Sequence, residues 1–585
     1  MKTHQREKSR KDIVLKNKGL YVIIGILVFI AVYFGIGELI QNEEVAFGKE
    51  IKKQPDEWMK IIATSTNSAV ITIDVDGKTY NSTDYNIYMS DDMQLMCPVK
   101  LISEMFGCAC NIYNDSVLRI VRGNDIVQLS GREDTLVVNG DIGIDSARLV
   151  KTGGEYEVSV SGLARSLGYD YEWNAGINQG KLTNIDETDD ILPARYSYID
   201  ENRAPIVKNQ GSLGTCWAFA SLTALESSLM PEEVFDFSED HMTLCNPYNI
   251  NTDVGGDYEM AVAYLTSWKG PVKEENDPYD DGKTDDTLGA VKHVQEVVMP
   301  QEKDYDTIKR IVLQHGGVQS SIYAANTTSK LIYSDYYNRN YNSYCYNEKK
   351  TPNHEIVIIG WDDNYPKENF NVEVEGNGAF ICRNSWGEEF GEKGNFYISY
   401  YDANIGITNV AYTKVEDIDN YDNIYQSDLC GWVGQIGYGS DEAYFANVYT
   451  AKGNEHLEAV SFYATGKDTR YSIYYCDEFE GPDSLTRRGD PVISGKIDDK
   501  GYYTIPLDKT IYLREGQKYA IIVKITTPES ERPVAIEFKN DYLTADADIT
   551  DGEGYVSLKG IEWENTESSH ECNVCLKAFT QNVTK

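Results

Sequence analysis

The sequence predicts a multidomain protein with an N-terminal transmembrane helix, a small α+β repeat module, a larger α+β domain and a C-terminal all-β jelly-roll sandwich. Three observations predict this fold class. The chain has 585 residues, too many for a single hydrophobic core. An uncharged apolar run lies close to the N-terminus. Further along, a mixture of helical and strand-like segments gives way after residue 419 to strand after strand.

Residues 1–37 have the features of an uncleaved membrane anchor. Lys and Arg dominate residues 1–18, whereas residues 19–37 carry no charge and are long enough to span a bilayer. A secretory signal peptide has a shorter apolar core and a small-residue cleavage site, which this segment lacks, and a cleaved signal peptide is the alternative. Because basic residues stay on the cytoplasmic side, we expect a single-pass type II protein of the cell membrane with an extracytoplasmic remainder.

The charge and the cysteine content exclude several classes of protein. The net charge of -39 repels nucleic acid and anionic lipid, so we expect no nucleic-acid partner. The 11 cysteines are too widely spaced for a disulfide-stapled scaffold. Cys572 and Cys575 have CxxC spacing, but the chain has no second CxxC and the surrounding residues alternate as in a strand. We therefore expect no metal site and no cofactor.

A small folded module is predicted over residues 67–185. It opens on an alternating run with an Asp-Gly pair, which indicates a β-hairpin. Residues 98–114 and 159–174 form a weak internal repeat in which helix, glycine and strand follow one another, with Gly107 and Gly168 expected as helix C-caps. The segment resembles the copper amine oxidase N-terminal-like repeat module, a common stalk on bacterial surface proteins. That resemblance implies no copper site.

Cys216 lies between a loop of small residues and an apolar helix, in the run QGSLGTCWAFA. A buried core thiol is one interpretation. A nucleophile is the other, because the positive end of a helix dipole lowers the pKa of a thiol. A catalytic thiolate needs a histidine, and of the 7 histidines only His354 begins a run, EIVIIGW, that is typical of a buried strand. The end of such a strand could face the start of the helix.

Two amide side chains complete a set of groups for acyl transfer. Asn384, in the run NSWGEEFGEKG, could accept a hydrogen bond from the imidazole and fix its tautomer. Trp386 could shield that bond from water. Gln210 shortly precedes Cys216, and its amide could donate to a developing oxyanion together with the Cys216 backbone N–H.

These segments, in this order, resemble the papain family of cysteine peptidases over residues 192–415. The resemblance implies a papain-like α+β fold and a thioester acyl-enzyme mechanism. It implies that Cys216 is the nucleophile, His354 the general base and acid, Asn384 the orienting residue and Gln210 the oxyanion donor.

The resemblance also implies a cleft that binds polypeptide substrates. Gly255 and Gly256 would bind the substrate backbone in the non-primed half of the cleft. Trp386, Asn353 and Ser321 are the other predicted substrate-binding residues.

Residues 420–585 indicate a β-sandwich or jelly roll, because short strands alternate with regularly spaced turns. The run YQSDLCGWVGQIGYGSDEAYFANVYTA resembles the lectin-like domain that follows papain-like domains in some anaerobic bacterial proteins. Fold alone does not imply sugar binding. This domain could therefore contact a glycan or the peptidase domain.

Three functions of different kinds fit these observations. The first is a cell-surface cysteine endopeptidase, the second a cell-wall amidohydrolase, and the third a surface adhesin or glycan-binding protein with a vestigial peptidase domain. The upstream glutamine and the NSWG run favour the first over the second, and the intact catalytic set disfavours the third. The predicted parts are a cytoplasmic basic tail (1–18), a transmembrane signal anchor (19–37), a stalk (38–66), the repeat module (67–185), the peptidase domain (192–415) and the lectin-like sandwich (420–585).

Overall fold

A computed structural model describes residues 70–583 except 115, 124, 186–191, 281, 327–328 and 541. The predicted cytoplasmic tail, membrane anchor and stalk lie outside these residues. Within the described ranges, no helix is both long enough and apolar enough to cross a bilayer.

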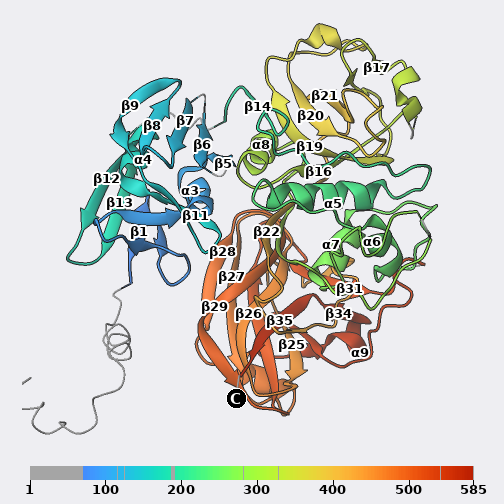
Figure 1. Cartoon of the computed structure of the whole chain (residues 1–585). Coiled ribbons are helices and arrows are strands. Elements are labelled where there is room, and N and C mark those ends of the chain that lie inside the picture. Colours follow the sequence, from blue (N-terminus) through green and yellow to red (C-terminus); the bar gives the residue numbers. More distant parts are fainter. Residues whose placement is uncertain are drawn as a thin grey trace, which may run out of the picture. The chain divides into compact units, whose positions relative to one another are not determined.

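The N-terminal module contains three small sheets and two helices (Figure 1). Its first strand, β1, pairs in parallel with its last, β13, so the two ends of the module close against each other. The elements are β1 (Thr72–Val75), β2 (Lys78–Asn81), β3 (Tyr88–Met89), β4 (Leu95–Pro98), α3 (Val99–Phe106), β5 (Ala109–Tyr113), β6 (Val117–Arg122), β7 (Asp125–Ser130), β8 (Thr135–Val138), β9 (Asp141–Ser146), β10 (Leu149–Thr152), β11 (Glu155–Ser159), α4 (Val160–Ser166), β12 (Tyr169–Asn174) and β13 (Gln179–Asn184).

The predicted hairpin and both helix, glycine and strand repeats are present, but Gly168 is not the helix C-cap that the sequence predicted. Strands β1 and β2 form a hairpin, and Asp76 and Gly77 at its turn both have positive φ angles, as a two-residue type I′ turn requires. Helix, glycine and strand follow one another in both copies of the repeat. Gly107 is the C-cap of α3 with a left-handed backbone. In the second copy the C-cap is Leu167, and Gly168 takes the left-handed conformation one residue later, with φ 79.

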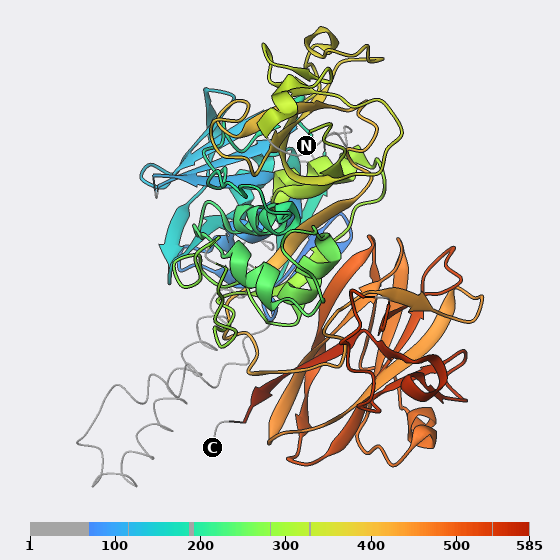
Figure 2. The ribbon, with the colours of Figure 1, turned by 90° about the vertical axis from the view of Figure 1, so that its right-hand side faces the viewer.

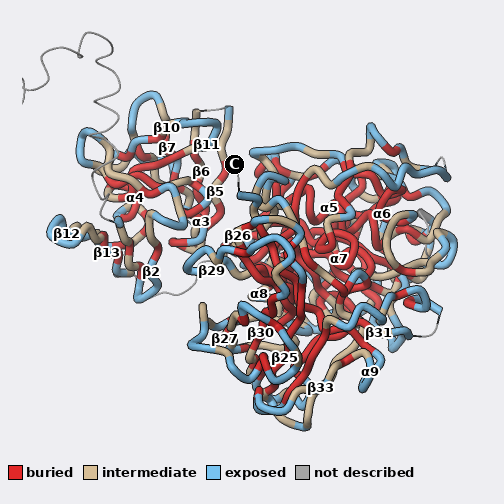
Figure 3. The backbone as a smooth tube through the Cα atoms, turned by 90° about the horizontal axis from the view of Figure 1, so that it is seen from below, coloured by how far each residue is buried: buried red, intermediate tan, exposed pale blue. Residues whose placement is uncertain are grey.

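The central domain is α+β, as predicted. Its longest helix, α5, is buried along nearly its whole length (Figure 3) and contacts β19 and β22 of the sheet. The elements are β14 (Arg195–Ser197), α5 (Cys216–Leu229), α6 (Glu239–Cys245), α7 (Tyr258–Thr266), β15 (His293–Val298), α8 (Tyr305–Gln314), β16 (Val318–Ile322), β17 (Tyr337–Asn338), β18 (Ser343–Tyr344), β19 (His354–Asp362), β20 (Ala379–Arg383), β21 (Asn395–Ser399) and β22 (Asn409–Glu416).

The C-terminal domain is an all-β sandwich, drawn in orange and red in Figure 2. One layer has the strand order β28-β27-β30-β25-β32-β33, and the other contains β29, β26, β35 and β23. The elements are β23 (Asn423–Tyr425), β24 (Gly434–Ile436), β25 (Glu442–Thr450), β26 (Glu455–Ala464), β27 (Thr469–Cys476), β28 (Ile493–Ile497), β29 (Gly501–Leu513), β30 (Lys518–Thr526), β31 (Val534–Phe538), β32 (Gly554–Ser557), β33 (Glu564–Asn565), α9 (Thr566–His570), β34 (Cys572–Val574) and β35 (Leu576–Asn582).

One sheet runs through both the central and the C-terminal domain. Strand β15 pairs with β22 on one side and with β29 on the other, which makes a single 13-stranded sheet. A single hydrophobic core also includes buried residues of both domains. An unpaired edge strand exposes backbone donors and acceptors, and β29 satisfies those of β15. The two domains, which the sequence suggested as separate units, therefore share a sheet and a core.

The module contacts the central domain through a buried carboxylate. Glu201, 6% exposed, accepts hydrogen bonds from Asn111 Nδ2 at 3.0 Å and from the Tyr113 hydroxyl at 2.8 Å. It also forms an ion pair with Arg119. The donors come from the neighbouring strands β5 and β6, so one carboxylate holds two strands of the module.

Candidate active site

Strand pairing brings His354 and Asn384 together. His354 is the first residue of β19, and Asn384 directly follows the last residue of β20, its antiparallel neighbour. His354 Nε2 lies 2.8 Å from Asn384 Oδ1, and both side chains are 3% exposed. Because an amide oxygen only accepts, Nε2 carries the proton and Nδ1 keeps its lone pair.

Two neighbours hold this pair in place. The Ser385 backbone N–H donates to the same Asn384 Oδ1 at 2.8 Å. The Trp386 ring stacks on the imidazole, with the ring centroids 4.4 Å apart and an angle of 21° between the planes. Trp386 is 5% exposed. The structure therefore places it as a cover over the histidine, as the sequence suggested.

Cys216 is the first residue of α5 and is a partly exposed residue. Burial raises the pKa of Cys216 to about 12, and the negative charge of Glu355 adds to this effect. Hydrogen bonds from the backbone N–H groups of Glu355, Trp217 and Cys216 itself lower that pKa. Glu355 is the residue that follows His354. Helix α5, which begins at Cys216, packs against β19, which begins at His354.

Burial opposes a charge on either group alone. Burial lowers the pKa of His354 to about 4, and the hydrogen bond to Asn384 opposes this shift. Transfer of the Cys216 proton to the imidazole creates a thiolate and an imidazolium whose charges cancel. Opposite charges at close range stabilise each other in a poorly solvated site. Burial thus favours the neutral form of each group, and a charged pair would form only by proton transfer from the thiol to the imidazole.

The side chain of Gln210 is fixed at both ends of its amide. Its Oε1 accepts from the Ser385 hydroxyl at 2.6 Å, and its Nε2 donates to the Leu213 carbonyl at 2.9 Å. The Gln210 backbone N–H donates to the Ser385 carbonyl at 2.9 Å. An amide nitrogen carries two hydrogens, so one remains for a substrate oxygen.

The predicted glycine wall lies against the start of α5. A Cβ added to Gly256 would come within 2.7 Å of Trp217 Nε1, and one added to Gly214 within 2.6 Å of the Gly255 nitrogen. Gly255 also has a φ of +87, a conformation that favours glycine. These contacts require glycine and place the wall beside the residues that flank Cys216.

The two other predicted substrate contacts have partners within the chain. Asn353 Oδ1 accepts from the Ala324 N–H at 2.7 Å, and its Nδ2 donates to the Ala324 carbonyl at 3.1 Å. Asn353 therefore holds the loop before His354. The Ser321 hydroxyl donates to Glu355 Oε1 at 2.5 Å.

Glu355 belongs to the site, although the sequence analysis did not single it out. It is 9% exposed and also accepts from Gln319 Nε2 at 3.2 Å. Burial raises its pKa to about 7, and the negative charge of Asp257 raises it further. The signal in the sequence was a single acid at the head of the otherwise apolar run that follows His354.

The described residues contain no cluster of three or more His, Cys, Asp or Glu side chains that could hold a metal ion. Cys572 and Cys575 are buried free thiols. The predicted catalytic side chains are a thiol, an imidazole and two amides, those of Cys216, His354, Asn384 and Gln210.

Two family models match the chain. The papain family cysteine protease model covers residues 192–415, and the lectin-like domain model covers residues 424–580. The chain is 30% identical to the clostridial cysteine protease Cwp84 after propeptide cleavage, with a TM-score of 0.60, and the match covers 66% of this chain and 99% of that one. The chain belongs to the papain family of cysteine proteases.

Other relatives agree with this membership. The structure of the cysteine protease and lectin-like domains of Cwp84, a surface layer associated protein of Clostridium difficile, is 29% identical with a TM-score of 0.58, and covers 67% of this chain and 89% of that chain. A viral cathepsin from Choristoneura fumiferana defective polyhedrosis virus is 29% identical to this chain. The match covers 37% of this chain and 62% of the viral cathepsin. Cysteine proteinase 1 of Entamoeba histolytica is 28% identical over 34% of this chain, which again spans 62% of the relative.

These matches confirm the predicted papain-like and lectin-like domains. The likeness of residues 67–185 to the copper amine oxidase N-terminal-like module stays a prediction.

Proposed function

We propose that the chain is a cysteine endopeptidase that cleaves polypeptides through a thioester acyl-enzyme, with a Cys-His-Asn triad and a glutamine in the oxyanion hole. The observation that carries the proposal is the 2.8 Å bond between His354 and Asn384, together with the packing of α5, which begins at Cys216, against β19, which begins at His354. Membership in the papain family supports the same reaction.

The reaction begins with transfer of the Cys216 proton to His354 Nδ1. The thiolate attacks the peptide carbonyl carbon, and the negative charge that develops on the carbonyl oxygen is stabilised by Gln210 Nε2 and the Cys216 backbone N–H. The imidazolium then gives its proton to the leaving amine, which departs and leaves a thioester. His354 next takes a proton from water, whose oxygen attacks the thioester carbon. The C–S bond then breaks, the carboxylic acid product leaves, and the imidazolium returns its proton to the sulfur. Asn384 keeps the imidazole in one tautomer throughout.

We also propose that the enzyme acts at the cell surface, held by its N-terminal segment as a single-pass type II membrane protein. Two things support this location. Residues 19–37 are uncharged and follow a basic segment, and the related Cwp84 is a surface layer associated protein.

The Cys216→Ala variant tests the proposed activity. It should lose essentially all hydrolysis of a fluorogenic peptide library, because it lacks the nucleophile. Cys245→Ala is the matched control, since Cys245 is another partly exposed free thiol that hydrogen-bonds to Thr284 and has no role in the reaction. Hydrolysis retained by Cys216→Ala, or lost equally in both variants, would rule out Cys216 as the nucleophile.

A further inference from the structure

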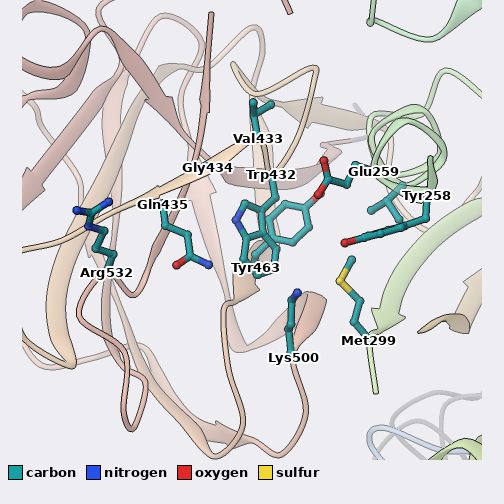
Figure 4. A pocket seen from close by; sticks show the side chains of 11 residues that line it. Tyr258, Glu259, Met299, Trp432, Val433, Gly434, Gln435, Tyr463, Lys500 and Arg532 are labelled. Atoms are coloured by element: carbon teal, nitrogen blue, oxygen red, sulfur yellow. The ribbon is translucent and has the colours of Figure 1, made fainter. Parts of the chain in front are cut away.

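A cavity of about 380 Å³ lies between helix α7 of the peptidase domain and the C-terminal domain (Figure 4). The peptidase domain contributes Tyr258, Glu259 and Met299 to its lining, and the C-terminal domain contributes Trp432 and Lys500 among others. The Met299 backbone N–H donates to the Lys500 carbonyl at 2.8 Å. Since β15 and β29 also pair directly before and after these two residues, the two walls of the cavity are fixed relative to each other.

One residue of the cavity lining, Tyr258, lies two positions after Gly256 of the glycine wall. Gly256, Asp257 and Tyr258 are consecutive, and the Asp257 side chain caps the start of α7 by accepting from the Glu259 N–H at 3.0 Å. Successive Cα atoms are 3.8 Å apart, so Tyr258 is at most about 8 Å from Gly256. An extended polypeptide bound along Gly256 would cover that distance with two or three residues.

The lining combines aromatic surfaces with an excess of positive charge. The Trp432 and Tyr463 rings lie 5.6 Å apart at 58°, and Lys500 Nζ lies 4.7 Å from the centre of the Trp432 ring. Figure 4 shows Lys500 pointing toward these rings and Arg532 on the other side of Gln435. Two cations thus face the cavity, against the single carboxylate of Glu259.

Neither cation forms an ion pair with a described residue: across the described ranges, no acid lies within ion-pair distance of Lys500 or of Arg532. Burial lowers the pKa of Lys500, and the negative charge of Glu259, the one acid in the lining, opposes that effect. A partly buried ammonium without an ion-pair partner is costly unless a ligand supplies the opposite charge.

We propose that this cavity is a subsite of the peptidase that takes an acidic side chain of the polypeptide substrate, about two to four residues before the scissile bond. The carboxylate would lie between Lys500 and Arg532, and the aliphatic part of the side chain would contact Trp432 and Tyr463. The C-terminal domain then selects substrates for the peptidase. This inference rests on the proposed function.

Matched peptides with the full chain test the subsite. All peptides share one cleavable sequence. In each peptide, one of the three positions that lie two to four residues before the scissile bond carries Glu, Gln or Lys. At one of these positions Glu should raise kcat/KM about tenfold over Gln, the effect of one charge-assisted hydrogen bond, and Lys should lower it. Equal kcat/KM for all three residues at every position would overturn the proposal.

Variants separate a subsite from a structural role. Lys500→Met and Arg532→Gln should each bring kcat/KM for the Glu peptide down to the value for the Gln peptide. Lys518→Gln, an exposed lysine of the same domain, is the control and should keep the preference for Glu. A variant that lowers kcat/KM equally for the Glu and Gln peptides, and so keeps the preference, would contradict the proposal.

The Cys216→Ala variant makes this test independent of catalysis. It should bind the Glu peptide, measured by fluorescence anisotropy, and the combined Lys500→Met change should weaken that binding about tenfold. Should wild-type chain fail to hydrolyse any peptide, the proposed function fails while this binding still decides the subsite. Binding of a neutral oligosaccharide that competes with the Glu peptide would assign the cavity to a sugar instead.

Discussion

At the scale of single residues, Ser385 connects the two halves of the site. Its backbone N–H donates to Asn384 Oδ1, and its hydroxyl donates to Gln210 Oε1. Ser385 therefore holds both Asn384, the proposed orienting residue, and Gln210, the proposed oxyanion donor. When Ser385 makes both hydrogen bonds, Gln210 Nε2 has little rotational freedom. A preorganised oxyanion hole requires a donor that is fixed in this way.

Replacement of Gln210 tests this arrangement. Gln210→Ala should lower kcat about 10²- to 10³-fold, because one donor to the oxyanion is lost. Ser385→Ala removes only the hydrogen bond that aims the amide and should cost tenfold or less. Steady-state kinetics on one peptide compares them. An unchanged kcat in Gln210→Ala would place the oxyanion hole elsewhere.

Glu355 gives the stability of the enzyme a particular pH dependence. Its folded-state pKa is raised to about 7 from 4.5, so between these pH values the folded chain binds more protons than the unfolded chain. The stability that Glu355 contributes to the free energy of unfolding is therefore fully present below about pH 4.5 and is lost as the pH rises through 7. Urea unfolding should show Glu355→Gln to be more stable than wild type above pH 7, by up to about 3 kcal/mol, but not at pH 4.

An exposed glutamate close to the site is the control for this experiment. Glu388→Gln should change stability equally at both pH values, since Glu388 is exposed. A Glu355→Gln effect that is the same at pH 4 and pH 8 would contradict the assignment.

At the scale of elements, the sequence predicted pieces whose information is local. Periodicity and glycine placement were sufficient for the helix, glycine and strand of each repeat, for helix α5 after Cys216 and for strand β19 from His354. Short motifs were sufficient to predict the hydrogen bond between His354 and Asn384, because both residues lie at the ends of adjacent strands. Glu355 was missed because strand periodicity does not reveal which buried acid has hydroxyl and amide partners on a neighbouring strand.

The contact between the module and the peptidase domain depends on β5 and β6 and on one carboxylate. Glu201→Ala should leave Asn111 and Arg119 without their acceptor and destabilise the chain by about 3–5 kcal/mol, as the loss of one partner of a buried ion pair does. A double-mutant cycle with Arg119→Met, measured by urea unfolding, should give a coupling of about 0.5–3 kcal/mol. Additive effects would show that the Arg119–Glu201 pair adds nothing to this contact.

At the scale of the whole molecule, the peptidase and lectin-like domains share one sheet and one hydrophobic core. Their shared sheet passes through β15, which pairs with β29 about two hundred residues later in the chain. No local pattern in the sequence predicts this pairing. Pairings of this kind depend on the complete fold and not on propensity. The lectin-like domain therefore contributes to the stability of the peptidase as well as to the cavity beside its cleft.

Removal of the C-terminal domain tests this dependence. Residues 192–415 alone should unfold at a lower temperature than the full chain, because the edge of β15 and part of the common core become exposed. In differential scanning calorimetry of the full chain, both domains should unfold in one transition. Two separate transitions, with the isolated domain as stable as the full chain, would contradict the shared core.

The pairing of Cys216 with His354 is tested most directly by covalent labelling with a thiol-directed epoxide, with the site mapped by mass spectrometry. We expect the label on Cys216 alone among the 11 cysteines, and we expect His354→Ala to slow labelling at least about 100-fold because the proton acceptor is gone. A label on another cysteine, or an unchanged rate in His354→Ala, would show that these two residues do not work as a pair.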